Sequence, residues 1–491
     1  MKIRFKYIFF VCLTATLITG CSKEDVLELT PEFQLDAINN PSTLQQVEQV
    51  LLGTYARFRA GDYYGSASGT GAGWALMPDV LSDNIWETQE SLANSRAMAD
   101  WIYDASTAQI NNIYVAPTNV IASANIVLRD VDKFATATNQ TTINRIKGQA
   151  LAIRALAHFD LFRYFAVNYD RNSTTVLAIP YSKEFVVSTS FKPARLNNKE
   201  FYDNLFADIT EAISLLSNVD KPINPGGLTR PFIDLNGAYA LQARAYLYAE
   251  QWSEAATAAT NAINNRPLAG GNSFIGMYNQ TNLGEIIWNV QFESGQGGPT
   301  FIMFFPAQNR AYFRPAFEVV NQDNTGLIKT DDVRYAAYFE VVNGLLAITK
   351  YKGKGIVRDG NANFIVFRTG EMYLIRAEAR ARMGQDANAL DDLNALRAAR
   401  IQGYTPVSGL TNAQILQEIA DERRRELIGE GHRFFDLKRT TRTIVRGSTC
   451  GDITLSPTGN CTLSSSAREW AFPIPEIRRN ANENLTQNPG Y

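Results

Sequence analysis

Histidine and cysteine, the side chains that most often act as general bases and transition-metal ligands, are scarce in this sequence. The 491 residues include two histidines, His158 and His432, and four cysteines. Neither histidine belongs to an HExxH motif or has a second histidine near it in the sequence. Both are therefore interpreted as structural or surface residues, and we expect no metal site, no cofactor and no catalytic residue.

Carboxylate pairs are the remaining groups that could do acid–base chemistry. Asp331 with Asp332, and Asp79 with Asp83, have the residue types that glycoside hydrolysis requires. A chain with 49 Asp and Glu residues offers such pairs by chance, and sequence spacing does not show how far apart two carboxyl groups lie. A surface glycoside hydrolase that uses loop carboxylates therefore remains an alternative function.

Signatures of phosphate binding and of nucleophilic catalysis are missing from the sequence. The glycine-rich segment 65–73 lacks the Lys-Ser/Thr pair that completes a P-loop, and the chain has no GxSxG nucleophile elbow. With 47 Lys and Arg residues against 49 Asp and Glu residues, the formal charge is −2, whereas a phosphate backbone usually requires a positive surplus. We therefore expect neither an enzyme nor a nucleic-acid partner.

The first 20 residues are typical of a secretory signal peptide. Three basic residues precede an apolar run of ~7–15 residues, which is too short to span a membrane. The sequence LITGC at 17–21 resembles a bacterial lipobox, in which the cysteine is diacylated and becomes the new N-terminus. We expect residues 1–20 to be removed, Cys21 to be lipidated and residues 21–40 to form a linker.

Removal of this segment changes the formal charge from −2 to −5, because it takes away three basic residues and no acidic one. The residues SKED at 22–25 then resemble the short export signal of surface-exposed lipoproteins. Two or three acyl chains on Cys21 would give the stable anchoring that a single chain does not give.

The other two cysteines outside the signal segment, Cys450 and Cys461, lie in a stretch rich in Gly, Ser and Thr. Secreted chains enter an oxidising compartment, where a disulfide that closes such a short loop can form and persist. We expect the two residues to be bridged, the alternative being two free thiols. A metal site is not expected there, because further ligands at zinc-site spacing are missing from the neighbouring sequence.

Amphipathic helices recur along the chain. Between residues 146 and 166, apolar residues follow one another at steps of three or four, the spacing of one helix face. Asn197 with Glu200, and Thr411 with Gln414, have the residue types and spacing of capping boxes. They predict two further helices, one that runs to residue 216 and one that runs toward residue 427.

An internal repeat indicates helix pairs. Aromatic and small residues between positions 239 and 267 fall on the offsets of a tetratricopeptide unit, in which small side chains let two helices approach closely. Tyr373, Ala377 and Ala389 repeat part of this pattern, each 134 residues after its counterpart. This distance is far longer than one unit, so we expect helix pairs separated by a long insertion.

Two insertions are expected to carry the variable part of the protein. Residues 268–366 are rich in Gly, Asn, Phe and Tyr without a sustained helical period, which predicts loops with a few short strands. Residues 61–106 form a second irregular region. Insertions in helical solenoids tend to lie on one face, often the binding face. We expect one domain over residues 41–491, with its helical scaffold mainly in residues 41–60, 107–166, 196–267 and 367–440.

The charged run from Asp421 to Glu426 alternates in sign at helical spacing. Asp421 can pair with Arg425, and Arg423 can pair with Glu426, along one helix. We interpret the run as a self-compensated and solvated helix face, the alternative being a basic ligand site.

Three blocks near the C-terminus together resemble the SusD/RagB family of nutrient-binding lipoproteins of Bacteroidetes. They are FRTGEMYLIRAEA at 367–379, ERRREL at 422–427 with EGHRFFDLKR at 430–439, and FPIPE at 472–476 leading to QNPGY at 487–491. The N-terminal half is also similar, through GQA at 148–150, IPY at 179–181 and the segment 202–216. With the lipobox, the resemblance spans nearly the whole chain.

The resemblance implies a mainly α fold, in which tetratricopeptide-like helix pairs form a right-handed superhelical scaffold with long irregular loop insertions and a few short strands. It implies a lipoprotein of the outer membrane, anchored through Cys21 and facing the extracellular side. Such proteins capture a nutrient, usually an oligosaccharide, and pass it to a SusC-like TonB-dependent barrel. A peptide or another nutrient is the alternative ligand, because the shared blocks do not include the family's ligand residues.

A glycan site needs flat aromatic faces for the apolar sides of sugar rings, with amides or carboxylates at their edges to bind hydroxyls. Trp86, with Asn84 and Gln89 beside it in the sequence, is the first candidate. Trp74 and Tyr312 come next. The alternative is that these aromatic residues anchor their loops to the helices.

Overall fold

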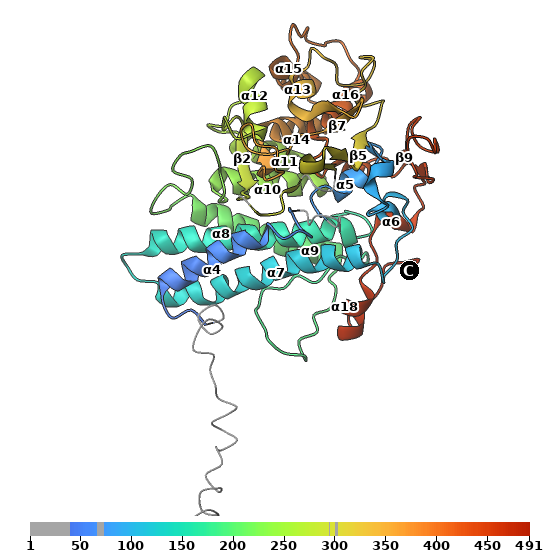
Figure 1. Cartoon of the computed structure of the whole chain (residues 1–491). Helices are drawn as coiled ribbons and strands as arrows, with labels where there is room; N and C mark the ends of the chain where they lie inside the picture. The colour runs from blue at the N-terminus through green and yellow to red at the C-terminus, as the bar shows by residue number, and fades with distance from the viewer. Residues whose placement is uncertain (1–39, 66–72, 294, 300–302) are drawn as a thin grey trace, which may run out of the picture.

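The structure is a computed structural model that describes residues 40–65, 73–293, 295–299 and 303–491. The predictions for the signal segment, for Cys21 and for residues 21–39 of the linker lie outside the described residues. The fold class is confirmed, because the described chain is mainly helical with a few short strands (Figure 1).

Long antiparallel helices form the lower layer in Figure 1. α4 packs on α7, α7 on α8, and α8 on α9. The predicted helix near residues 146–166 is confirmed, but it is buried on nearly all sides because α7, α9 and α10 surround it. Gly148 lets α9 come close, since a Cβ there would lie 2.8 Å from Leu216 Cγ. The helices are α4 (Leu44–Arg57), α7 (Ala108–Asp130), α8 (Gln140–Phe165) and α9 (Asn198–Leu216).

The upper layer contains the two helix pairs of the repeat. α10 packs on α11 and α14 on α15, as the repeat predicts. α11 also packs directly on α14, and α14 contacts α16, so the long insertion between the pairs leaves the stack continuous. None of the described helices has both the length and the apolar character that a membrane crossing requires. The helices are α10 (Leu235–Tyr248), α11 (Trp252–Ala262), α14 (Thr369–Arg382), α15 (Asp386–Arg400) and α16 (Asn412–Leu427).

Both predicted capping boxes are confirmed. The Asn197 side chain accepts a hydrogen bond from the Glu200 amide at 2.9 Å, and the Glu200 carboxylate accepts one from the Asn197 amide at 3.1 Å. Thr411 and Gln414 make the same reciprocal pair at the start of α16. Because these contacts join residues three apart, they can be recognised in the sequence.

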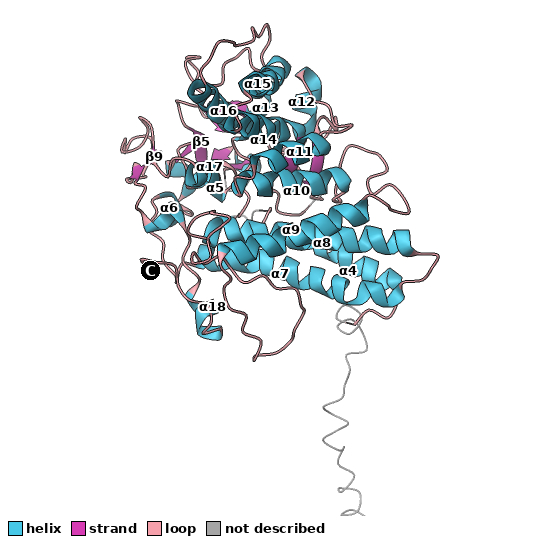
Figure 2. Cartoon of the chain, turned by 180° about the vertical axis from the view of Figure 1, so that it is seen from behind, coloured by secondary structure: helices cyan, strands magenta, loops and turns pink. Residues whose placement is uncertain are grey.

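The two irregular regions lie beside the upper layer, where the strands of Figure 2 gather. The described strands pair only two by two, all antiparallel: β1 with β5, β2 with β8, β3 with β4, β6 with β7, and β9 with β10. The prediction of loops with short strands for residues 268–366 misses two short helices, α12 and α13.

These shorter elements have the following bounds. The first region holds α5 (Met77–Val80), β1 (Ile85–Glu87), η1 (Gln89–Ser91) and α6 (Arg96–Ala99). The second holds α12 (Gly271–Tyr278), β2 (Ile286–Val290), β3 (Phe304–Phe305), β4 (Arg310–Ala311), β5 (Phe313–Pro315), α13 (Val333–Tyr338), β6 (Phe339–Val342), β7 (Leu345–Ile348) and β8 (Phe364–Arg368). Beyond α16 come α17 (Arg433–Arg439), β9 (Ile444–Val445), β10 (Thr462–Leu463) and α18 (Glu476–Ala481).

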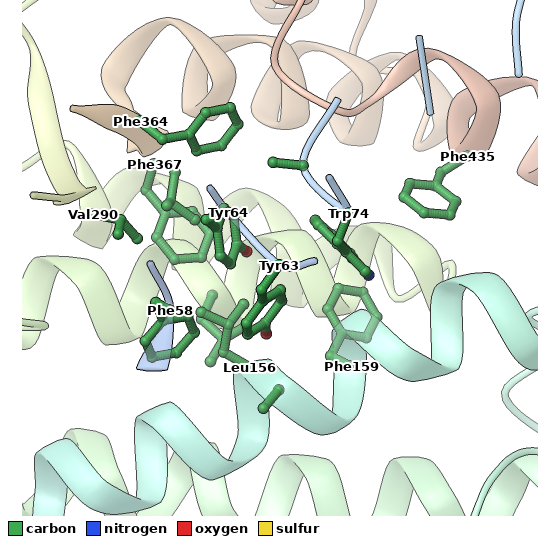
Figure 3. Close-up of a cluster of buried hydrophobic side chains, with 14 of the residues drawn as sticks. Phe58, Tyr63, Tyr64, Trp74, Leu156, Phe159, Val290, Phe364, Phe367 and Phe435 are labelled. Atoms are coloured by element: carbon green, nitrogen blue, oxygen red, sulfur yellow. The ribbon is translucent and has the colours of Figure 1, made fainter. Parts of the chain in front are cut away.

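An aromatic core joins the two layers (Figure 3). Phe58 from the end of α4, Tyr63 and Tyr64 from the following loop, and Phe159 from α8 meet side chains of β2 and β8 there. The hydroxyls of Tyr63 and Tyr64 donate to one oxygen of Asp160, at 2.7 and 2.9 Å. Each buried phenol therefore has a partner, which avoids the cost of an unpaired polar group.

A buried ionic network ties the C-terminal helices to the insertion. Glu426 of α16 accepts from Arg334 of α13 at 2.9 Å and from Arg400 of α15 at 3.0 Å, and it also binds Arg368 at the end of β8. Arg368 and Arg400 both reach Glu285, at 3.0 and 2.8 Å. All five side chains are at most 1% exposed.

The network corrects the interpretation of the charged run 421–426. Glu422 and Glu426 do not lie on a solvated face, and Arg423 binds Asp436 at 3.0 Å instead of Glu426. Arg425 pairs with Glu422 at 2.9 Å, an i,i+3 contact, and not with Asp421. Helical spacing shows which residues share a face, but here α13, α15 and β8 cover that face and supply its counter-charges.

Candidate functional site

The structure corrects the prediction that Trp74 contacts a ligand. Its side chain is 2% exposed and lies in the aromatic core between Tyr63, Phe159 and Phe435 (Figure 3). The Arg163 guanidinium lies over its ring at 4.9 Å from the centroid. No ring face is left for a sugar, so Trp74 anchors its loop to the helices.

Trp86 and Asn84 are also buried. Trp86, in β1, is 5% exposed, donates its indole N–H to Pro315 O at 3.0 Å, and lines a cavity of only about 10 Å³. Such a space holds at most one water molecule. Asn84 donates to Asp79 at 3.0 Å and accepts from Arg424 at 3.0 Å. Both predicted ligand contacts are therefore corrected to structural roles.

Gln89 and Tyr312 do reach the surface, and they lie on adjoining segments. β1 pairs with β5. Just beyond this pair, the amide of Thr88, which follows β1, donates to the carbonyl oxygen of Tyr312, which precedes β5, at 2.9 Å. Gln89 is exposed and Tyr312 is half-buried, with its ring nearly parallel to that of Phe305, at an angle of 25° and a centroid distance of 6.5 Å. The two residues thus share one surface of the irregular regions.

Polar side chains join the segments that carry these two aromatic residues. The Glu90 carboxylate accepts from the Ala311 amide at 2.8 Å and from Asn343 Nδ2 at 3.4 Å, and Asn343 also reaches Asn309 O at 3.3 Å. These contacts join η1, the β3–β4 hairpin and the β6–β7 hairpin. We call the set the loop surface; it consists of Gln89, Glu90, Phe305, Asn309, Tyr312 and Asn343.

The loop closed by Cys450 and Cys461 borders the loop surface. The structure joins the two cysteines in a disulfide, and Gln89 donates to Ile453 O within this loop at 3.2 Å. Aromatic faces beside amide and carboxylate groups have the chemistry that a sugar ring with hydroxyls needs. No sequence pattern indicated these further residues: Glu90 and Asn343 come from segments far from Tyr312 in the chain, and Asn309 lies in the β3–β4 turn just before it.

Three of the four carboxylates weighed for hydrolysis are engaged in structural contacts, and the fourth, Asp331, is exposed. Asp79 is fully buried and accepts from the amides of Gly429 and Gly431, each at 3.1 Å. Burial raises its pKa despite these hydrogen bonds. Asp83 accepts from Arg433 at 2.7 Å, and Asp332 pairs with Arg334 at 2.6 Å. These carboxylates hold loops to α16, α17 and α13.

Both histidines are buried. His158 lies parallel to the Tyr181 ring at 3.8 Å and accepts at Nε2 from the Ser182 amide at 2.9 Å. Burial lowers the pKa of His158 to about 3 and that of His432 well below its usual value, so both stay neutral at pH 7. Within the described residues, no group of three or more His, Cys, Asp and Glu side chains is placed to hold a metal ion.

Two protein-family models match this chain. One, described as "Starch-binding associating with outer membrane", matches residues 41–247, and the other, described as "SusD family", matches residues 335–491. The chain belongs to the SusD family. The second match contains the three C-terminal blocks that indicated this family in the sequence.

Curated SusD-like relatives include two proteins of Formosa agariphila. SusD-like protein P38 is 25% identical over 60% of this chain and 66% of its own length. SusD-like protein P2 is 23% identical over 99% of both chains. The starch-binding protein SusD of Bacteroides thetaiotaomicron is 35% identical, over 26% of this chain and 21% of its own length.

Solved SusD-superfamily structures share the fold. A structure described as a putative sugar binding protein from Bacteroides vulgatus aligns with a TM-score of 0.76 and 25% identity, over 91% of this chain and 99% of its own. A SusD superfamily protein from Bacteroides thetaiotaomicron aligns with a TM-score of 0.76 and 24% identity, over 91% of this chain and 100% of its own.

Proposed function

We propose that this SusD-family protein binds a glycan on its loop surface and passes it to a SusC-like TonB-dependent barrel of the outer membrane. A lipid on Cys21 anchors the protein to that membrane, with the loop surface on the extracellular side. The protein acts by binding, without catalysing a reaction.

The observation that carries the proposal is the loop surface itself. Tyr312 and Phe305 expose part of their rings on insertions that the helices hold in place, and the Gln89 and Asn343 amides reach solvent beside them. The family match, and the descriptions of some relatives as starch or sugar binding, support a carbohydrate ligand. The lipobox supports the anchor.

Isothermal titration of the mature protein against a panel of oligosaccharides tests the glycan ligand. We expect at least one glycan to bind, and Tyr312→Ala to weaken its affinity at least about fivefold, since an aromatic ring on a sugar contributes on the order of 1 kcal/mol or more. Tyr373→Ala is the matched control, because Tyr373 is also half-buried but lies on α14.

Three outcomes of this titration contradict the proposal. No binding across a broad panel favours a peptide or another nutrient. If Tyr312→Ala and Tyr373→Ala changed the affinity equally, the ligand would not bind at the loop surface. Cleavage of a bound glycan during long incubation would establish the hydrolase instead.

The anchor is tested by membrane fractionation of the wild type and of Cys21→Ala. We expect the wild type with the membrane and the variant in the soluble fraction, because the diacylated thiol is lost. Co-purification with a barrel protein from the native membrane tests the transfer partner, and isolation of the native lipoprotein without any barrel would contradict it.

A further inference from the structure

A second, larger cleft lies away from the loop surface, among the scaffold helices. It has a volume of about 720 Å³, within the range of ~300–1,000 Å³ typical of ligand sites. Its walls are the loop between α8 and α9, the turn between α10 and α11, the end of α14, and α17 with the residues that follow it. It shares no residue with the loop surface.

Two arginines of this cleft have no carboxylate partner among the described residues. The Arg442 side chain is half-buried and donates only to main-chain carbonyls, to Val167 O at 3.1 Å and to Ser465 O at 3.4 Å. Arg382 is exposed at the rim, where its guanidinium lies 5.6 Å from the centre of the Trp252 ring. A guanidinium favours planar anions such as carboxylates, which it can bind through two parallel hydrogen bonds.

The other charged side chains of the lining are mostly cationic. Arg171 and Lys199 share one carboxylate, that of Asp203, and Arg439 is paired with Glu378 at 2.6 Å and with Asp436 at 2.9 Å. Lys438 is buried and donates to Arg163 O and Ala166 O, at 2.9 and 2.6 Å. The lining carboxylates are Asp170 and Glu250, both exposed at the rim and without an ion pair in the described structure. The lining itself therefore holds more cationic side chains than carboxylates.

A buried hydroxyl of the cleft also lacks an ordinary hydrogen bond. Tyr248 is 2% exposed, and its Oη makes no hydrogen bond of ordinary length but lies near the Arg163 guanidinium. Gln251 Oε1, on the adjoining turn, is likewise buried without a partner. Buried polar groups are nearly always hydrogen-bonded, so these two atoms have the capacity for a further polar partner. The half-buried indole of Trp252 lies beside them in the lining.

We propose that this cleft binds an acidic sugar, whose carboxylate or sulfate group contacts Arg442 and Arg382 and whose ring lies against Trp252. The Tyr248 hydroxyl and the Gln251 amide oxygen then bind oxygen and hydroxyl groups of the ligand. The proposal concerns a site separate from the loop surface, and it does not require a glycan to bind there.

Titration of the mature protein with glucuronate, glucose and inorganic sulfate, followed by ligand-observed NMR, tests this site. We expect glucuronate to bind at least about tenfold more tightly than glucose, because a hydrogen bond to a charged group contributes more than a neutral one. Arg442→Gln is expected to weaken glucuronate binding at least about tenfold, and Tyr248→Phe several-fold.

Matched variants separate these effects from general damage to the fold. Tyr351→Phe removes another unpartnered hydroxyl from a tyrosine that is also 2% exposed but lies outside the cleft. Arg230→Gln removes another partly buried arginine without a carboxylate partner in the described structure, also outside the cleft. Both are expected to bind glucuronate like the wild type, and circular dichroism checks that all four variants fold.

The proposal is overturned by equal affinity for glucose and glucuronate, by sulfate binding without glucuronate binding, or by no detectable glucuronate binding at millimolar concentration. It is also overturned if Tyr312→Ala abolishes glucuronate binding while Arg442→Gln leaves it unchanged, because the sugar then binds the loop surface. That result supports the proposed function, so the two proposals can fail independently.

Discussion

The buried carboxylate of Glu426 links three segments of the fold through ion pairs. Its carboxylate binds Arg334, Arg368 and Arg400, which come from α13, β8 and α15. Taking charges out of water costs free energy, which only close ion pairs with further hydrogen bonds offset. The arginines hold the pKa of Glu426 well below its usual value, so it stays ionised in spite of burial.

We expect Glu426→Ala to lower the free energy of unfolding by about 3–5 kcal/mol, because three buried guanidinium groups lose a counter-charge. Denaturant unfolding measures this change. Glu418→Ala is the control on the same helix: its side chain is 39% exposed and pairs with Arg397 at 2.6 Å, so we expect a loss below about 1 kcal/mol. Similar losses for the two variants would contradict the role given to the network.

At the scale of elements, the turn between α16 and α17 is held by main-chain contacts to the segment around α5. Gly429 and Gly431 donate their amides to Asp79, and both have positive φ, 70° and 78°. A Cβ at Gly431 would lie 2.1 Å from Ala75 O, whereas the nearest atom to a Cβ at Gly429 is 3.6 Å away. The close approach of two main chains therefore requires glycine at 431 more than at 429.

This difference makes a matched pair of substitutions. Gly429→Ala is expected to lower the free energy of unfolding by about 1–2 kcal/mol, the cost of a left-handed conformation for a residue with a Cβ. Gly431→Ala adds a steric clash and is expected to cost about 1–3 kcal/mol more. Thermal and denaturant unfolding of both variants measure the difference. If the two alanine variants were equally stable, the contact with Ala75 would not matter.

At the scale of the whole molecule, buried carboxylates beside arginines couple the fold to pH. The nearby arginines hold the pKa values of Glu378, Glu430 and Asp436 below their usual range and lower that of Glu422 to about 2. A carboxyl group whose pKa is lower in the folded state stabilises the fold above its unfolded pKa, about 4.3 for Glu. Asp79 acts in the opposite sense, because burial raises its pKa.

We therefore expect the free energy of unfolding to fall as the pH drops from about 6.5 toward 2, first because the unfolded chain protonates His158 and His432, and then because it protonates the paired carboxylates. Urea unfolding at a series of pH values measures the slope, which reports the extra protons bound by the unfolded chain. For Glu422→Gln we expect the free energy of unfolding to fall less steeply over this range, because one of the titrating groups is removed. A wild-type stability that does not change down to about pH 3 would contradict this.

Sequence patterns located the scaffold because helix formation depends on near neighbours. Each capping box, at Asn197 and at Thr411, joins residues within one helix turn. Each copy of the repeat, one with Tyr239 and one with Tyr373, lies within a single helix pair. The C-terminal blocks that indicated the family also include Arg368 and Glu426, which form part of the buried ionic network between β8 and α16.

Exposure could not be predicted in the same way, because it depends on segments that meet only after folding. Trp74 and Trp86 are in irregular, polar-rich stretches that suggest a surface, yet α8, α17 and β5 enclose them. The paired charges of α16 are buried for the same reason. The two candidate binding surfaces each collect side chains from several distant segments, so their composition follows from packing and not from any local pattern.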